Sequence, residues 1–516
     1  MRAVVTKPRD GGTALAPLAC VPVTAVAAGF AVVLLVLSWR TGLTGGELGA
    51  LAAGDHLAWG YVDRPPLLPM LARLAEAITG ESTLGARLPA VLLSTVGVVV
   101  TALTARELGG GRYAQVLASA LYASSAFLLS TGYLLVTTTV DAFLFAVAGW
   151  LLVRWARTCD DRLAIWLGVV TAVALQADYL MAALWAVLCI ALLTVGPRQL
   201  ANRPRLWVAG AVAALTTVPG LVWQAQHGWP RHAAWNTAES AMGAKLTFLP
   251  VLLLSAGLLA GALGACYGAV RLLRSDELSH YAFLGWTVIG VTAAYLALDF
   301  RPYNVAGLLP VLWAAASVDL ERHPLPRAVR WLPSWPVLLV SALLALPATA
   351  GLPGLPGLSS SALSPTTWLA RYGAKGPFDR QVGPRPGDAA WTGLADAVAA
   401  RYRELPAEVR PHVVIITQGY WAAAALDRFG GSRGLPEVYS GQGGYWYFGT
   451  PPEDAGPVLY IGDARDIRPY FNDLRELGPV GAGTPGSAAL PGGDTLWLAS
   501  GRREPWSRLW PELRTP

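Results

Sequence analysis

Charged residues are scarce in this sequence. Only 14% of its 516 residues are charged, whereas a soluble domain carries about 25%. Cysteine is scarce as well, and the four cysteines lie in or beside apolar runs, without metal-ligand spacing (Cys20, Cys159, Cys189 and Cys266). The sequence also lacks a glycine-rich phosphate loop, a cysteine–histidine zinc pattern and a G-x-S-x-G motif. The ordinary soluble chemistries therefore have no support here.

Long apolar runs are abundant, and 54% of the residues are hydrophobic. Runs of this kind approach the roughly 20 residues that cross a bilayer as a helix. The first run is followed by Ser38, Trp39 and Arg40 and not by a small-residue cleavage site, so we expect it to stay in the protein. The runs predict eleven spans, at about 17–39, 84–108, 113–130, 138–155, 162–176, 179–195, 205–224, 246–270, 281–298, 303–319 and 331–350.

The basic residues predict an orientation in the membrane. With the N-terminus inside, the inner segments hold more than twice as many Arg and Lys residues as the outer segments up to Arg301. Such a bias indicates a cytoplasmic N-terminus and, with eleven spans, an extracytoplasmic C-terminus of a protein in the cytoplasmic membrane. The net charge of +6 is thus a signal of topology and does not indicate nucleic-acid binding.

The chain changes character after residue 350. Residues 351–365 form a linker rich in Pro, Gly and Ser, and short β-type runs follow at 413–417, 458–461 and 495–498. Residues 394–405 and 422–429 have helical patterns. The fold class predicted is thus a polytopic α-helical membrane domain at 1–350, with a first outer loop at 40–83, followed by a small extracytoplasmic α/β domain at 366–516.

The first outer loop carries an unusual set of polar residues. Charged groups at the edge of a membrane are costly and tend to mark function. Arg64 can bind a phosphate through its planar set of donors, and a nearby carboxylate can accept a proton from an attacking hydroxyl. The alternative is an ordinary solvated loop in which Asp63 and Arg64 form a surface pair.

The order of several motifs carries a resemblance over nearly the whole chain. The stretch E-L-x7-H-L-A-W-G-Y-V-D-R-P-P-L from Glu47 is followed by the motifs ARLPAVLLS (86–94), ARELGGGRYAQ (105–115), TTTVDAFLF (137–145), VPGLVWQAQHGWP (218–230), RPYNVAGLLPVL (301–312), ITQGYWAAAALDRFG (416–430) and SGQGGYWYFGTPP (440–452). Together they resemble the family 39 glycosyltransferases, the bacterial relatives of protein O-mannosyltransferases and of the lipid A aminoarabinose transferase.

This resemblance implies a C-type glycosyltransferase fold and an activity. Such enzymes move a sugar, here mannose-like or another hexose or pentose, from a polyprenyl-phosphate donor to an acceptor at the outer face of the membrane, with inversion. They need no nucleotide cofactor at the site. The partners implied are the lipid-linked donor, the bilayer and an extracytoplasmic acceptor whose identity the sequence leaves open.

The resemblance also implies roles for carboxylates. Family members usually have Asp-Glu at the start of the outer loop, with the Asp as base, but this chain has Gly46 before Glu47. Glu47 is then the nearest substitute as the catalytic base, and Asp141 matches the second family acid. The structural alternatives are a carboxylate at a helix N-terminus for Glu47 and a helix cap or ion pair for Asp141. A divalent cation between the two stays open.

Further residues are expected around the substrates. Asp63 and Arg64 match an acidic-basic-Pro element of the family near the lipid phosphate, and Arg301 and Tyr303 begin a span at the same face. His56, Asp178 and His227 are weaker candidates for the acceptor or substrate, with loop packing as the alternative for the histidines. Asp178 stands where many relatives have a basic residue.

Two other functions remain open from the sequence. Gly46 and Asp178 both depart from the family pattern, which favours a catalytically degenerate relative that acts as a binding or scaffold protein. A transporter of lipid-linked sugars also fits many spans with polar residues. The sequence shows no inverted repeat, however, and a transporter leaves the C-terminal domain unexplained.

Overall fold

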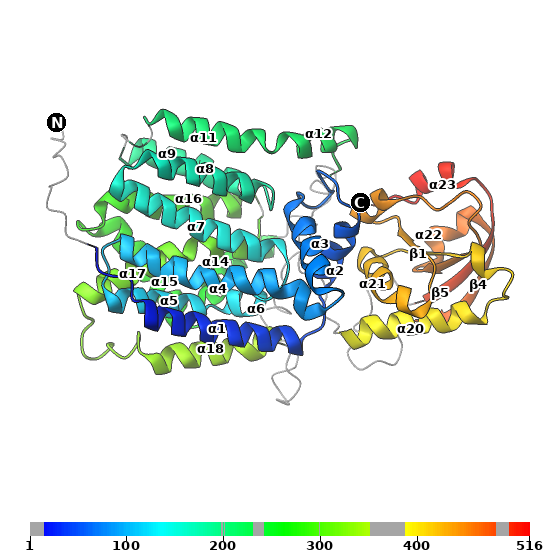
Figure 1. The fold of residues 1–516 in the computed structure, drawn as a ribbon, viewed down its shortest axis with the longest axis horizontal. Helices are drawn as coiled ribbons and strands as arrows, with labels where there is room; N and C mark the ends of the chain where they lie inside the picture. The colour runs from blue at the N-terminus through cyan, green and yellow to red at the C-terminus, as the bar shows by residue number, and fades with distance from the viewer. Residues whose placement is uncertain are drawn as a thin grey trace.

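The fold is taken from a computed structural model. It describes residues 15–197, 200, 202–230, 242–298, 300–350, 388–480 and 495–515. A bundle of helices forms the N-terminal part, and an α/β domain lies at the end of this bundle that is remote from the N-terminus (Figure 1). The predicted linker at 351–365 lies outside the described residues.

A helix or a pair of helices lies in each range predicted to span the membrane. They are α1 (Cys20–Arg40), α4 (Thr83–Glu107), α5 (Arg112–Ala123), α6 (Ala126–Thr131), α7 (Thr137–Thr158), α8 (Asp161–Leu175), α9 (Leu180–Thr194), α11 (Pro204–Leu215), α12 (Val218–Gln226), α14 (Met242–Ala256), α15 (Ala260–Arg274), α16 (Ala282–Ala297), the 3₁₀ helix η2 (Pro302–Leu308) with α17 (Leu309–Arg322), and α18 (Trp335–Ala350). Within the described residues, six helices are long and apolar enough to cross a membrane, or seven if one bent pair counts as a span. The chain is thus a multi-pass membrane protein, and the number eleven stays a prediction.

The range 246–270, predicted as one span, is broken. Its two parts, Phe248–Ala256 and Ala260–Arg274, meet at an angle of 108°. Gly257 lies at the break with φ of +128°, a conformation that glycine adopts readily and other residues do not. Beyond the break, α15 packs closely on α17, where a Cβ at Gly268 would lie 1.9 Å from the carbonyl oxygen of Leu312.

The first outer loop contains two helices that pack on each other, α2 (Gly45–Asp55) and α3 (Leu67–Thr79). Nearly all of α2 is buried, because α3 covers one side of it and α21 (Tyr420–Gly430) of the C-terminal domain covers another. The two loop helices therefore lie between the bundle and the C-terminal domain (Figure 1).

The C-terminal domain is built on a five-stranded mixed sheet. Its strands are β1 (Val414–Thr417), β2 (Val438–Ser440), β3 (Val458–Ile461), β4 (Phe471–Pro479) and β5 (Thr495–Arg502), in the order β2-β1-β3-β5-β4. The pairs of β1 with β2 and β3 are parallel, whereas β5 is antiparallel to both of its neighbours. Its helices are α20 (Asp388–Glu404), α21, α22 (Ala464–Ile467) and α23 (Trp506–Glu512).

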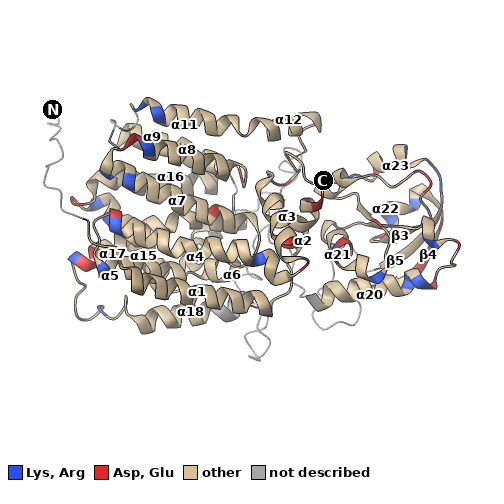
Figure 2. Cartoon of the chain, viewed as in Figure 1, with Lys and Arg blue, Asp and Glu red and all other residues tan. Residues whose placement is uncertain are grey.

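Most of the charged residues lie toward the two ends of the molecule (Figure 2). At the bundle end remote from the C-terminal domain, ion pairs link the helices; they include Arg157–Glu107, Arg271–Asp319 and Arg322–Glu277. These residues belong to the segments predicted to be cytoplasmic. The C-terminal domain lies at the opposite end of the bundle (Figure 1).

Candidate active site

The start of α2 holds the carboxylate expected to act as base. Thr44 caps this helix: its hydroxyl accepts from the backbone N–H of Glu47, and a Glu47 oxygen accepts from the backbone N–H of Thr44 at 2.9 Å. This reciprocal capping box follows from the Thr44-Gly45-Gly46-Glu47 sequence. It aims the Glu47 carboxylate back toward the helix bundle.

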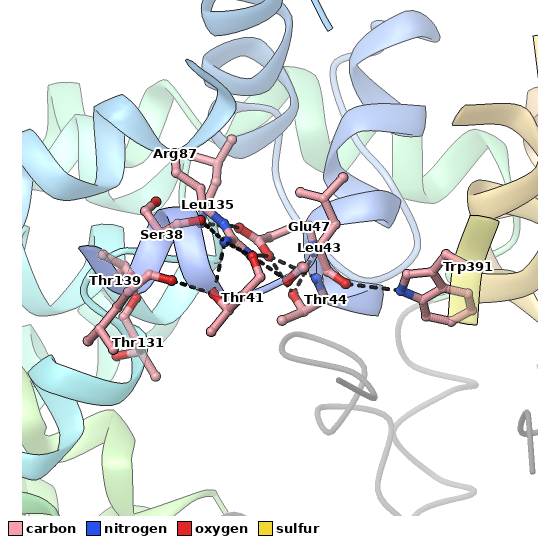
Figure 3. A network of polar contacts seen from close by, with 12 residues as sticks. Ser38, Thr41, Leu43, Thr44, Glu47, Arg87, Thr131, Leu135, Thr139 and Trp391 are labelled. Carbon is pink, nitrogen blue, oxygen red and sulfur yellow. Dashed lines mark hydrogen bonds and ion pairs between the residues drawn. The ribbon is translucent and has the colours of Figure 1, made fainter. Parts of the chain in front are cut away.

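Arg87 of α4 meets this carboxylate inside the protein (Figure 3). Its Nε lies 2.6 Å from Oε1 of Glu47 and its Nη2 lies 2.7 Å from Oε2. Both side chains are buried, with exposed fractions of 0% and 1%. The remaining donors of Arg87 bind carbonyl oxygens where α1 leads into the outer loop, at Ser38, Thr41 and Gly42. The pair thus joins α1, α2 and α4.

The same contacts keep Glu47 ionised. Burial raises the pKa of Glu47, but the charge and hydrogen bonds of Arg87, with the N–H groups of Thr44 and Leu135, outweigh burial and hold the pKa below its ordinary value. A carboxylate with a lowered pKa and both oxygens occupied is a weak proton acceptor. The role of Glu47 as base stays a prediction, and its surroundings favour a structural role.

Asp63 and Arg64 form an ion pair, but it is not the surface pair of the alternative interpretation. Nε and Nη2 of Arg64 lie 2.9 and 2.5 Å from Oδ2 of Asp63. Arg64 is only 2% exposed, and Asp63 is 20% exposed. The third guanidinium nitrogen, Nη1, is buried and has no hydrogen-bond partner among the residues that the structure describes. A buried unpaired donor is costly unless a ligand satisfies it.

The charge of Arg64 is secured by its neighbours. Burial lowers the pKa of a guanidinium, but Asp63, Tyr420 and Tyr61 more than offset burial and raise the pKa of Arg64 above its ordinary value. The loop around it is held by Gln224 of α12, whose amide donates to the carbonyl oxygen of Tyr61 at 2.7 Å. Arg64 is therefore a fixed positive charge in a shielded place, and such a place suits a phosphate.

Asp141 and Asp178 are both buried polar residues, 7% and 4% exposed. Asp141 lies in the second turn of α7, and Asp178 lies between α8 and α9, where its Oδ1 accepts from the backbone N–H of Tyr179 at 2.6 Å. Both carboxylates interact electrostatically with the buried hydroxyl of Tyr295. Both acids, although separate in sequence, are thus in the neighbourhood of Tyr295, whose hydroxyl donates to the carbonyl oxygen of Leu180 at 3.1 Å.

Arg301 and Tyr303 stand at the start of η2. Tyr303 stacks on Phe127 of α6 with ring centroids 6.1 Å apart. Helix η2 also packs on α7, because a Cβ at Gly307 of η2 would lie 3.1 Å from the Cα atom of Ala142 in α7. The segment expected to bind the donor thus lies against the turn of α7 that carries Asp141.

His56 and His227 lie against the C-terminal domain, each in an aromatic stack. The His56 ring is parallel to Phe448 at 4.7 Å, and His227 stacks on Trp223 at 4.1 Å and contacts Tyr447 edge-on at 5.3 Å. In both rings Nδ1 faces a backbone carbonyl oxygen of its own helix. These contacts agree with the alternative of loop packing, and a role toward the acceptor stays untested.

The C-terminal domain binds the outer loop directly. The indole N–H of Trp391 donates to the carbonyl oxygen of Leu43 at 3.0 Å, and the hydroxyl of Tyr420 donates to the carbonyl oxygen of Gly49 at 3.2 Å. Arg428 pairs with Glu76 of α3, and both side chains are nearly buried. The motifs at 416–430 and 440–452 predict the presence of this domain. Its contact with the outer loop depends on residue pairs more than 300 positions apart, which no local sequence pattern reveals.

No metal centre emerges from the described part of the chain, in which no group of three or more His, Cys, Asp or Glu side chains is placed to hold an ion. Arg87 already neutralises the Glu47 carboxylate. The residues present therefore do not fit a cation shared between Glu47 and Asp141.

Comparisons with known proteins agree with this architecture. Residues 63–223 match the family model described as dolichyl-phosphate-mannose-protein mannosyltransferase. The fold is similar to crystal structures of ArnT from Cupriavidus metallidurans. The apo structure has a TM-score of 0.59 and 14% identity over 92% of this chain and 97% of that chain. A structure bound to undecaprenyl phosphate has a TM-score of 0.58 and 16% identity over the same shares. No curated protein matches the sequence.

The fold is therefore that of the C-type membrane glycosyltransferases. The resemblance stated from the sequence motifs is confirmed, and so is the predicted architecture of a helical membrane domain with a small C-terminal α/β domain. The domain bounds and the side of the membrane on which the α/β domain lies stay predictions. The class of enzyme predicted from the motifs, a glycosyltransferase, is also that of the matched family model.

Proposed function

We propose that the chain is an integral-membrane glycosyltransferase with a polyprenyl-phosphate-linked sugar as donor. The sugar passes, with inversion, to an acceptor on the outer face of the cytoplasmic membrane. In this proposal the N-terminus is cytoplasmic, residues 1–350 form the transferase domain, and residues 366–516 form an extracytoplasmic domain joined to it by the linker at 351–365.

The main support for the proposal is the burial and the hydrogen bonding of the Arg64 guanidinium. A guanidinium that is 2% exposed, held by Asp63 on one side and with Nη1 unpaired among the described residues, is suited to a tetrahedral anion. It lies in the match to the mannosyltransferase family model. One of the similar structures was crystallised with a polyprenyl phosphate, undecaprenyl phosphate.

In the proposed reaction, the side chains of the candidate site have separate roles. The acceptor hydroxyl oxygen forms a bond to the anomeric carbon, while the bond from that carbon to the phosphate oxygen breaks. Arg64 stabilises the charge on the departing polyprenyl phosphate. Asp141 accepts the hydroxyl proton, because Glu47 is occupied by Arg87. Arg301 and Tyr303 contribute to the donor site from the segment packed on α7.

Two variants of Arg64 test the proposal. Wild-type protein in lipid nanodiscs should bind a polyprenyl phosphate and should transfer sugar from a polyprenyl-phosphate sugar. Arg64→Ala should weaken binding more than Arg64→Lys, because Lys keeps the charge without the paired donors. If wild type, Arg64→Ala and Arg64→Lys all bind alike, Arg64 does not hold the donor.

A degenerate relative that binds the lipid without catalysis is the second candidate. Gly46 favours it, because glycine offers no carboxylate at the position of the usual family base. The two candidates differ in one result: a scaffold binds the polyprenyl phosphate with Arg64 but turns over no lipid-linked sugar in any membrane fraction that contains its acceptor.

A further inference from the structure

Tyr420 is a side chain of the C-terminal domain that packs against the first outer loop. It begins α21, is 7% exposed, and donates its hydroxyl hydrogen to the carbonyl oxygen of Gly49 in α2. Its ring lies so close to α2 that a Cβ at Gly49 would approach the ring to 2.5 Å. The glycine in α2 therefore makes room for this ring.

The same tyrosine adjoins the candidate phosphate site. Tyr420 is, after Asp63, one of the neighbours that raise the pKa of the Arg64 guanidinium. The neighbouring 3₁₀ helix η6 (Gly443–Phe448) closes the other side, because a Cβ at Gly444 would lie 3.9 Å from Oδ1 of Asp63 and 3.7 Å from the Tyr420 ring. Asp63, Arg64 and Tyr420 thus form one cluster across the junction of the two domains.

Contacts within the C-terminal domain hold Tyr420 in place. The backbone N–H of Tyr420 donates to the side-chain oxygen of Gln442 at 2.7 Å, and its ring meets Tyr445 edge-on at 5.7 Å. Gln442 precedes η6, and the backbone N–H of Gly443 donates to the carbonyl oxygen of Thr515 near the end of the chain. A displacement of this domain would therefore carry Tyr420 away from Arg64.

We propose that Tyr420 is a positioning residue that sets the Arg64 guanidinium for the donor phosphate and so makes the extracytoplasmic domain part of the donor site. This inference rests on the proposed function of Arg64 and adds to it a residue from another domain. A simple packing residue at the junction would affect stability alone, whereas a positioning residue affects the affinity for the phosphate through Arg64.

Matched variants separate these roles. Tyr420→Phe keeps the ring but removes the hydroxyl, and Gly49→Ala displaces the ring without a change of charge. Trp391→Phe is the control for docking, because it removes one hydrogen bond of the same kind between the same two domains, to Leu43. Gly431→Ala is the control for the glycine change, since its Cβ would meet nothing within 4 Å.

The measurement is binding of a polyprenyl phosphate to each full-length variant in nanodiscs, alongside its melting temperature. We expect Tyr420→Phe, which loses the hydrogen bond to Gly49, and Gly49→Ala, which displaces the ring, each to weaken binding by about tenfold. Trp391→Phe and Gly431→Ala should bind like wild type. In an Arg64→Lys background, Tyr420→Phe should have a smaller effect, because its action passes through the guanidinium.

Different results would contradict the inference about Tyr420 and the proposed function. If wild type binds the polyprenyl phosphate and Arg64→Ala weakens binding, but Tyr420→Phe and Gly49→Ala bind like wild type, the inference fails and the proposed function stands. If Trp391→Phe weakens binding as much as Tyr420→Phe, docking alone is responsible and Tyr420 has no positioning role. If wild type does not bind the lipid, the proposed function itself fails.

Discussion

Glu47 and Arg87 form the most completely buried ion pair described in the protein, and its removal has a calculable cost. Glu47→Gln leaves the Arg87 charge buried without its counter-ion. Breaking such a pair costs about 3–5 kcal/mol. We therefore expect a large fall in melting temperature of the purified protein for Glu47→Gln. The control Glu404→Gln, in an exposed pair on α20, should melt like wild type.

The same variant tests the predicted catalytic role. A base that is lost lowers turnover by about a hundredfold or more at any temperature where the protein is folded. A structural anchor lowers turnover only in step with the folded fraction. Normal turnover per folded Glu47→Gln molecule, measured well below its melting temperature, would exclude Glu47 as the base.

Asp141 is the residue on which we expect catalysis to depend. Asp141→Asn keeps the shape of the side chain and removes the charge, so it should reduce sugar transfer by about a hundredfold or more while polyprenyl-phosphate binding persists. Asp178→Asn is the companion variant, because Asp178 interacts with the same tyrosine, Tyr295. If Asp141→Asn keeps full sugar transfer and Asp178→Asn loses it, Asp178 and not Asp141 is the base.

At the scale of the element, α21 carries an exposed carboxylate at the junction, Asp427, beside Tyr445. Desolvation by the atoms around Asp427 raises its pKa above the ordinary 3.8, while the hydrogen bond from Tyr445 and the charge of His56 lower it and nearby Asp55 adds to the rise. A raised pKa means that the folded protein binds the proton more tightly than the unfolded chain. This contribution to stability is present at acidic pH and is lost as the pH rises through the pKa of the folded state.

Asp427→Asn should therefore raise the melting temperature slightly at neutral pH, by about 1 °C, because solvent screens an exposed charge. The gain should shrink as the pH falls toward that pKa. Thermal unfolding of the detergent-solubilised protein at several pH values measures this difference. Asp396→Asn is the control of opposite sign, because a hydrogen bond from Arg433 lowers the pKa of Asp396. A lower melting temperature for Asp427→Asn at neutral pH would mean that the charge is needed there.

Elements with strong local patterns could be predicted from the sequence. The apolar runs give the helices of the bundle, and the runs at 413–417 and 458–461 coincide with β1 and β3, whose residues are all buried or nearly so. Strand β4 could not be found in this way, because most of its side chains are exposed or half-buried and form no apolar run. The break at Gly257 was missed because the hydropathy stays high on both sides of it.

The candidate site was only partly predictable for a related reason. Asp63 and Arg64 are adjacent, so their pairing follows from the sequence. The contact of Glu47 with Arg87 and that of Tyr420 with Gly49 bring together residues 40 and 371 positions apart. Such contacts depend on how the helices pack, which no periodicity encodes.

At the scale of the whole molecule, the site and the orientation in the membrane are linked. Arg64 lies in the outer loop, which packs on the C-terminal domain. Arg157, Arg271 and Arg322 lie in the last turns of α7, α15 and α17, where they pair with acidic residues at the other end of the bundle. If the arginine-rich end is cytoplasmic, as the distribution of basic residues predicts, the donor phosphate binds at the outer face. The accessibility of single cysteines can test this.

Two single-cysteine proteins make the test. One has all four natural cysteines replaced and carries Asp463→Cys in the C-terminal domain, where Asp463 lies partly exposed before α22. The other keeps only Cys159, which is exposed at the end of α7, on the side predicted to be cytoplasmic. A membrane-impermeant thiol reagent should label the cysteine at position 463 on intact cells and Cys159 only after lysis. The reverse pattern would place Arg64 and the acceptor site at the cytoplasmic face, so a donor exposed outside the cell would be unable to reach the enzyme.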